Sequence, residues 1–144
     1  LNLLLDKSFI PDVIQVPYNF FDRRFADSGL LEMMKSLGVE VHTRSVFLQG
    51  LLLADKENLP KQFLCYKSLW DRFEIMLFEN GINKLDFLLQ YVFQDQRVDK
   101  VVIGVSTKAE LIDIIASLKS IIKLDNDKFE LGNIDNSLID PRLW

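Results

Sequence analysis

Cysteine is almost missing from this chain of 144 residues, because Cys65 is the only one. A single cysteine excludes a disulfide within the chain and is typical of a reducing compartment, so we expect a cytoplasmic protein. Glycine and proline are also scarce, with 6 and 4 residues, which excludes a collagen-like or low-complexity chain. The composition, 49% hydrophobic and 26% charged, is that of one folded domain.

Long apolar runs and an excess of positive charge are missing too. The longest apolar stretches, 46–54 and 114–118, are much shorter than the ~20 residues that span a bilayer. No signal-peptide pattern opens the chain. Lys and Arg number 17 against 21 Asp and Glu, a net charge of −4. A chain with this charge lacks the basic footprint of a nucleic-acid or lipid-surface protein, so we expect neither partner.

The short motifs of metal, P-loop and Rossmann sites do not occur, so we predict no metal site. The one histidine, His42, lies within a predicted strand, and we interpret it as a structural or surface residue. Cys65 has no histidine or basic cluster beside it, so we do not expect a nucleophile. The pair Arg23–Arg24 is interpreted as a surface or ion-pair feature.

Runs of β-branched residues alternate with segments of helical spacing. The patterns predict strands at 12–18, 39–45 and 100–105, and helices at 29–37, 66–79 and 84–94, with another from 107 and the end of one in 1–10. Ser28 is expected to cap the first of these helices, and Thr107 with Glu110 forms a capping box. Strands separated by helices pair in parallel, so we predict the α/β class.

The same patterns predict which side chains are buried. The apolar run 100–105 is typical of a strand covered on both faces. Two helical stripes are expected to face the core: Trp70, Phe73, Met76 and Leu77 in one helix, and Leu111, Ile114, Ile115 and Leu118 in another.

Three strands are few for a parallel sheet, which hides both faces and usually has five or six strands in a domain of this size. The chain also begins with Leu1 rather than with methionine. We therefore expect part of a larger closed sheet. A small complete α/β domain with further, unrecognised strands remains the alternative.

Four segments in order resemble the C-terminal half of an aldo/keto reductase: 13–19, 44–51, 102–106 and the closing 140–144. In that family the fold is a TIM (β/α)₈ barrel, which typically needs ~250 residues. The resemblance implies a partial barrel with about three parallel strands and flanking helices, similar to strand–helix units six to eight. Residues 1–144 would then form a single domain, the C-terminal portion of such a barrel.

The resemblance also implies a site for NADP or NAD. Gln15 would bond the nicotinamide carboxamide, Arg44 would lie against the ring, and Ser106 would lie at the adenosine ribose. The implied cofactor-binding residues are Gln15, Arg44, Ser45, Phe47, Gly50, Gly104, Ser106 and Glu110. We expect Gln15, Ser45 and Ser106 to lie side by side at the carboxyl ends of the strands.

The chain departs from the family pattern around its last helix. The family usually has Gln or Arg where Glu110 stands, a Glu–Asn pair at Asp113–Ile114, and in some NADP-dependent members Lys at Val105. Glu110 also suits a purely structural role in the capping box. The choice between NADH and NADPH therefore remains open.

The family's catalytic Asp, Tyr, Lys and His match nothing in this chain, so we predict no catalytic residue and expect the chain alone to be inactive. The resemblance implies reduction of an aldehyde or ketone, a small-molecule carbonyl substrate, with the missing N-terminal half as partner. A non-catalytic half-barrel that binds nucleotide or self-associates is the alternative. An unrelated β/α-barrel fragment is a third reading.

Overall fold

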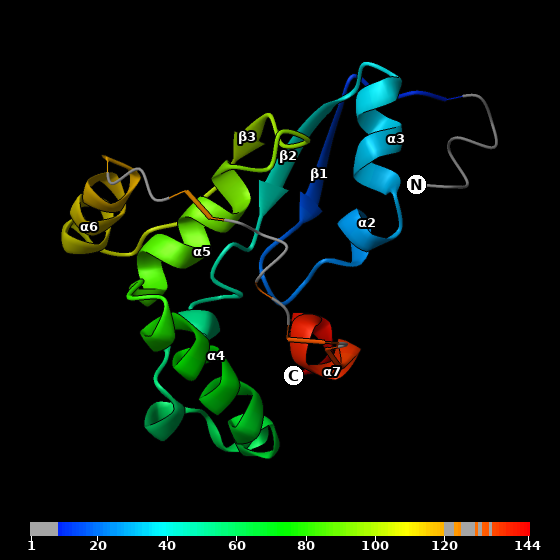
Figure 1. Cartoon of the computed structure of the whole chain (residues 1–144). Helices are drawn as coiled ribbons and strands as arrows, with labels where there is room; N and C mark the ends of the chain where they lie inside the picture. Colours follow the sequence, from blue (N-terminus) through cyan, green and yellow to red (C-terminus); the bar gives the residue numbers. More distant parts are fainter. Residues whose placement is uncertain (1–8, 120–122, 125–128, 130, 133) are drawn as a thin grey trace.

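A computed structural model describes residues 9–119, 123–124, 129, 131–132 and 134–144. Three parallel strands form one open sheet in the order β1-β2-β3: β1 is Val13–Pro17, β2 is Glu40–Arg44 and β3 is Lys100–Val101 (Figure 1). The predicted α/β class with about three parallel strands is therefore confirmed. The helix predicted in 1–10 lies almost wholly outside the described residues.

Helices separate the strands along the chain. The α-helices are α2 (Arg24–Asp27), α3 (Leu30–Ser36), α4 (Lys67–Glu79), α5 (Lys84–Phe93), α6 (Lys108–Lys119) and α7 (Asn136–Ile139). Short 3-10 turns are η1 (Leu51–Leu53), η2 (Lys56–Asn58), η3 (Lys61–Tyr66) and η5 (Pro141–Leu143). The helices predicted at 66–79 and 84–94 are confirmed, whereas the short α2 was not predicted. Within the described residues, no helix has the length and apolar character needed to cross a bilayer.

The two faces of the sheet differ in chemistry. Ile14, Val16 and Val41 point to one face and pack with α3 in a small apolar cluster. Gln15 and His42, which are partners in the register of β1 and β2, alternate with those residues and so lie on the other face. Gln15 is exposed and His42 is half-buried, so this face is polar and open to solvent.

The main core lies among α4, α5 and the segment that follows β1. Phe20 and Phe73 are fully buried there, and the Phe20 ring meets Phe87 edge-on at 4.8 Å between centroids. Each aromatic pair of this kind adds about 0.5 to 1.5 kcal/mol beyond its buried area. The predicted stripe of α4 is confirmed, because Trp70 and Leu77 are buried as well and Met76 packs against them.

A buried ionic network ties the loop after α5 to β1 and α3. The Tyr18 hydroxyl donates to Asp95 Oδ2 at 2.7 Å, and Arg97 Nη2 donates to the same oxygen at 2.6 Å. Arg97 also pairs with Glu32 of α3. Burial acts to raise the pKa of Asp95, but the hydrogen bonds from Arg97 and Tyr18 outweigh it and leave the pKa below its ordinary value.

The third predicted strand is shorter than expected. Only Lys100–Val101 pair with β2, and Val102 and Val105 are exposed instead of covered on both faces. The reason is that β3 is an edge strand: on the side away from β2, no other strand of the described residues pairs with it. The apolar run at 100–105 therefore cannot be read as a fully buried strand.

Two expectations about helices are wrong. In α6 only Ile114 of the predicted stripe is buried, and Leu111 and Ile115 are exposed, because α6 packs chiefly against α5 at the edge of the molecule (Figure 1). Ser28 does not cap α3, since its hydroxyl donates to the Phe25 carbonyl at 3.1 Å. Gly29 instead starts α3 in the left-handed region, with φ of 72°.

Candidate functional site

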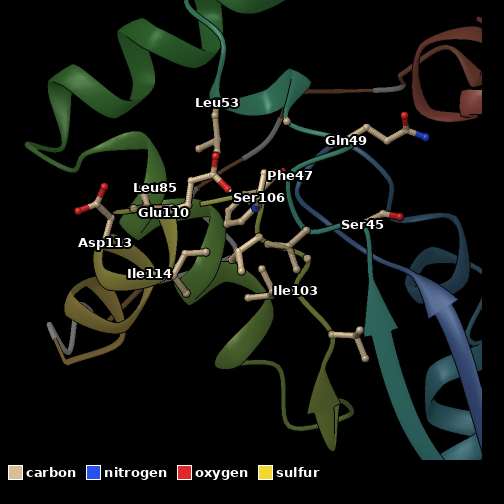
Figure 2. Close-up of a pocket in the computed structure, with 15 residues that line it drawn as sticks. Ser45, Phe47, Gln49, Leu53, Leu85, Ile103, Ser106, Glu110, Asp113 and Ile114 are labelled. Atoms are coloured by element: carbon tan, nitrogen blue, oxygen red, sulfur yellow. Dashed lines mark hydrogen bonds between the residues drawn. The ribbon is translucent and has the colours of Figure 1, made fainter. Parts of the chain in front are cut away.

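A cavity of about 730 Å³ lies where the chain leaves β2 and β3 (Figure 2). Its volume falls within the ~300–1,000 Å³ that is usual for small-molecule sites. The described residues that line it are Ser45, Val46, Phe47, Gln49, Gly50, Leu53, Leu85, Val102, Ile103, Gly104, Val105, Ser106, Glu110, Asp113 and Ile114. Because β2 and β3 are parallel neighbours, their carboxyl ends bring segments 45–50 and 102–106 together.

The segment after β2 forms one wall of the cavity in an unusual conformation. Ser45, Leu48 and Gln49 have φ of 64°, 47° and 55°, and Gly50 follows at 84°. Left-handed non-glycine residues cost about 1 kcal/mol or more each, so they persist only where the surroundings hold them. Here the buried Asn19 holds the turn, because its Nδ2 donates to the Ser45 carbonyl at 2.8 Å.

This turn presents polar groups at the cavity. The Gln49 and Gly50 amides make no hydrogen bond to another described residue. Gly50 lines the cavity, and a Cβ built on it would meet nothing within 4 Å, so there is free space beside its backbone. Successive free N–H groups in such a turn are suited to an anion such as a phosphate.

The opposite wall comes from 102–106 and α6. The Glu110 carboxylate accepts from the Ser106 amide at 2.7 Å, and the Glu110 amide donates to Thr107 Oγ1 at 3.1 Å. The capping box predicted for this helix is therefore confirmed, with the reach of Glu110 extended to Ser106. Figure 2 shows Glu110 and Asp113 projecting from α6 on one side of the cavity, with Ser45 on the other.

Charge is distributed unevenly around the cavity. Arg44, the last residue of β2, donates from Nη1 to Ser45 Oγ at 3.1 Å, which holds its guanidinium beside the Ser45 wall. The α6 wall carries two carboxylates, Glu110 and Asp113. Among the described lining residues there is no lysine or arginine.

The cavity brings together most of the predicted site residues. Six of them line it: Ser45, Phe47, Gly50, Gly104, Ser106 and Glu110. Arg44 is not among the described lining residues, but it donates a hydrogen bond to the lining residue Ser45. Gln15 lies at the middle of β1, exposed, and is not among the described lining residues. The three residues expected side by side are therefore not placed so: Ser45 and Ser106 line opposite walls of one cavity, and Gln15 lies outside its described lining.

Some lining residues were not among the predicted site residues. Asp113 was named only as a departure from the family pattern, although it follows Glu110 by three positions, a spacing that puts both on one helix face. Leu85 comes from α5, far along the chain, and its helical stripe gave no sign that it would reach the cavity. Only the packing of α5 against α6 brings it there.

The titratable groups that could donate a proton lie elsewhere. His42 Nε2 lies 2.8 Å from Glu40 Oε1, which agrees with its predicted structural role. The Tyr66 hydroxyl is 2.5 Å from Ser137 Oγ. Burial raises the pKa of Tyr18, as do the nearby Tyr91 and Asp95, and a raised pKa makes a poor acid. No cluster of metal-ligating side chains was found among the described residues.

The Arg23–Arg24 pair and Cys65, which the sequence analysis also considered, lie outside the described lining of the cavity. Arg24 makes two hydrogen bonds of 2.8 Å to the buried Asp22, and Arg23 lies 3.8 Å from Asp27. The ion-pair interpretation of Arg23–Arg24 is therefore confirmed. Cys65 is an exposed free thiol whose Sγ lies 3.8 Å from the Gln62 carbonyl oxygen.

Two solved structures are similar to this chain. The thermostable aldo-keto reductase Tm1743, solved with the inhibitor epalrestat, has a TM-score of 0.56 and 18% identity over 81% of this chain and 37% of its own. The aldo-keto reductase AKR11C1 from Bacillus halodurans, in a holo form, has a TM-score of 0.63 and 18% identity over 94% of this chain and 49% of its own. The three-stranded sheet and its helices thus share the fold of part of these barrels, and the chain spans less than half the length of either protein.

The sequence itself gives the family. A search of curated proteins found no match. The family model of the aldo/keto reductases matches residues 2–134, nearly the whole chain, although the closing segment 140–144 of the resemblance lies beyond it. This chain belongs to the aldo/keto reductase family.

Proposed function

We propose that this chain, as a single domain over 1–144, supplies the C-terminal, cofactor-binding part of an NAD(P)H-dependent oxidoreductase that reduces an aldehyde or ketone. The observation that carries the proposal is the cavity at the carboxyl ends of β2 and β3, where Ser45, Gly50 and Ser106 meet. In β/α barrels the strand ends of this side carry the active site, and the loops after the last two strands often hold phosphate.

The residues present suit a dinucleotide. The free amides of Gln49 and Gly50, together with the Ser45 hydroxyl, offer donors to a diphosphate. Arg44 adds a positive charge beside them through its contact with Ser45. Apolar side chains such as Phe47, Leu53 and Leu85 line the remainder and would cover the flat rings.

The chemistry that a reduced nicotinamide supplies is transfer of a hydride to the carbonyl carbon. The part of this chain is to bind and orient. Gln15, exposed on the polar sheet face, carries a donor and an acceptor for a carboxamide and stays a predicted contact. Residues 47–63 would form part of the substrate wall. The proton donor would come from a partner half, since His42 and Tyr18 are engaged in structural contacts.

The test is a titration of the chain with NADH, followed by nicotinamide fluorescence. Gly50→Leu places a side chain into the cavity at a left-handed residue, and we expect at least about tenfold weaker binding. Gly81→Leu is the matched control, because Gly81 also has a positive φ and free space around it, but lies at the end of α4. Equal binding by both variants, or none by the wild type at millimolar NADH, would refute the proposal.

A non-catalytic half-barrel that self-associates is the second candidate. It is favoured by the solvent-exposed sheet face at Gln15 and by exposed Val13 on the edge strand β1. Open edges and apolar groups of this kind invite pairing with a second copy or with an N-terminal half. Sedimentation velocity distinguishes the candidates, since a dimer that ignores NADH supports the second and a chain that binds NADH supports the first.

We also propose a cytoplasmic location. The single cysteine, Cys65, is a free and exposed thiol, the state that reducing compartments maintain. Fractionation of cells that express the tagged protein checks this, and recovery in an oxidising compartment would contradict it.

A further inference from the structure

Asn19 is a polar side chain in apolar surroundings. Its neighbours in the chain, Tyr18, Phe20 and Phe21, belong to the main core, and Asn19 itself is 0% exposed. A buried amide is stable in such a place only if its oxygen and nitrogen have hydrogen-bond partners. No role was predicted for Asn19 from the sequence, although segment 13–19 of the family resemblance ends on it.

The two ends of the Asn19 side-chain amide bind two different segments. Oδ1 accepts from the Phe21 amide at 2.9 Å and from the Asp22 amide at 2.8 Å, both in the loop after β1. Nδ2 donates to the Ser45 carbonyl at 2.8 Å, in the turn after β2. Asparagine carries an acceptor and a donor on one short side chain, whereas aspartate has only acceptors and leucine has neither.

The bond to Ser45 ties the wall of the cavity to another part of the fold. The other hydrogen bonds that segment 45–50 makes with described residues stay within 44–53. Three non-glycine residues of this segment have a positive φ, a conformation that persists only where the surroundings hold it. Among the described residues, Asn19 therefore makes the hydrogen bond that holds this turn from outside.

The loop that carries Asn19 is itself well anchored. Asp22 is 0% exposed, and Arg24 donates to both of its carboxylate oxygens at 2.8 Å. A bidentate pair of this kind fixes geometry as well as adding stability. Asn19 therefore transfers the position of a fixed loop to the wall of the cavity.

From these contacts we propose that Asn19 is a positioning residue for ligand binding, which holds the turn 45–50 in the conformation where the free Gln49 and Gly50 amides line the cavity. The identity of the ligand, a nicotinamide dinucleotide, rests on the proposed function. A wall that is ordered before the ligand arrives spares the ligand the cost of ordering it, so loss of the Asn19 bond weakens binding. By reciprocity, a ligand on the turn stabilises the loop after β1.

Asn19→Asp tests the bond most closely, because a carboxylate still accepts from the loop amides but cannot donate to Ser45. We expect at least about tenfold weaker NADH binding, and at least about tenfold faster hydrogen exchange of the Leu48 amide, which donates to the same Ser45 carbonyl. Asn19→Leu is the second variant, since it removes the donor without burying a charge.

Asn80→Asp is the matched control. Asn80 Nδ2 donates to the Met76 carbonyl at 2.8 Å at the exposed end of α4, outside the described lining of the cavity. The same kind of bond is lost there, and we expect NADH binding and Leu48 exchange to stay as in the wild type. Urea unfolding of each variant gives the folded fraction, to which the NADH dissociation constant is referred.

A purely structural role for Asn19 would lower the midpoint of urea unfolding and leave NADH binding by the folded fraction unchanged. That result overturns the inference, as does unchanged Leu48 exchange in a folded Asn19 variant. Should both Asn19 variants fail to fold, the wild type decides. NADH that slows exchange of the Phe21 and Asp22 amides supports the inference, and no such protection overturns it.

If the wild type binds no NADH, the proposed function falls. The Leu48 exchange of Asn19→Asp then still tests the hold on the turn: faster exchange supports it, and unchanged exchange overturns it.

Discussion

Asp95 is the shared acceptor of a buried polar network beside the end of β1. It is buried, accepts from the Tyr18 hydroxyl at 2.7 Å and pairs with Arg97, which also reaches Glu32. The partners that hold Asp95 include a residue distant in the sequence, because Tyr18 lies 77 positions before it. This contact could not be predicted from the sequence, because the polar run from Asp95 to Lys100 is typical of a solvated connection.

Replacing Asp95 with Asn is expected to lower the free energy of unfolding by about 2 to 3 kcal/mol, since it removes the buried charged acceptor of the Tyr18 hydroxyl and leaves Arg97 with Glu32 alone. Urea unfolding at neutral pH measures the change. Asp27→Asn is the control, because Asp27 is largely exposed and lies 3.8 Å from Arg23, so a change below about 0.5 kcal/mol is expected. Equal effects of both variants would contradict the buried network.

Asp95 also makes the free energy of unfolding depend on pH. Arg97 and Tyr18 outweigh burial and lower the pKa of Asp95 in the folded chain. A lowered pKa contributes stability above the ordinary value of about 3.9, and that stability is lost as the pH falls through the folded-state value. Urea unfolding between about pH 5 and pH 2 should therefore show a steeper decline for the wild type than for Asp95→Asn. If the free energy of unfolding of the wild type and of Asp95→Asn fell equally with pH, Asp95 would not be the source of this pH dependence.

At the scale of elements, prediction from sequence was best where a helix buries a clear stripe. The stripe of α4 is confirmed at Trp70 and Phe73, because α4 lies on the aromatic core. The predicted burial of the α6 stripe is wrong at Leu111 and Ile115, which are both exposed. Their burial would need a packing partner on that face of α6. Local periodicity predicts a helix and its apolar face, and only tertiary packing decides whether that face is covered.

Two phenylalanines of α4 test this directly. Phe73 is 0% exposed and Phe78 is 88% exposed. We expect Phe73→Ala to reduce the free energy of unfolding by about 3 to 5 kcal/mol, because it leaves a cavity in the aromatic core. Phe78→Ala is expected to change it by less than about 0.5 kcal/mol. Similar losses in thermal or urea unfolding would show that α4 packs through another face.

At the scale of the whole molecule, the site depends on two parallel strands ending at the same edge. The family resemblance in the sequence led us to expect segments 45–50 and 102–106 at one edge of the sheet, and both line the same cavity. The predicted strand 12–18 already has Gln15 at its middle, but only the three-dimensional arrangement of the described strands shows that this position lies outside the described lining of the cavity. Asp113 was noted as a departure from the family pattern, and its place in the cavity wall depends on how α6 packs.

The open sheet leads to a prediction about assembly. The polar face at Gln15 and the free edge of β1 are solvent-exposed in the isolated chain. We expect the chain to self-associate with rising concentration, and a separately supplied N-terminal barrel half to compete with that association. Sedimentation velocity over a concentration series measures both effects. A strictly monomeric chain that binds no such half would contradict the expectation.

We propose that segments 45–50 and 102–110 together hold a nicotinamide dinucleotide. The change in backbone amide resonances of the nitrogen-15-labelled chain on addition of NADH tests this residue by residue. We expect saturable shifts confined to those two segments and their neighbours, with little change in α3. Shifts confined to other parts of the chain, or none at millimolar NADH, would contradict it.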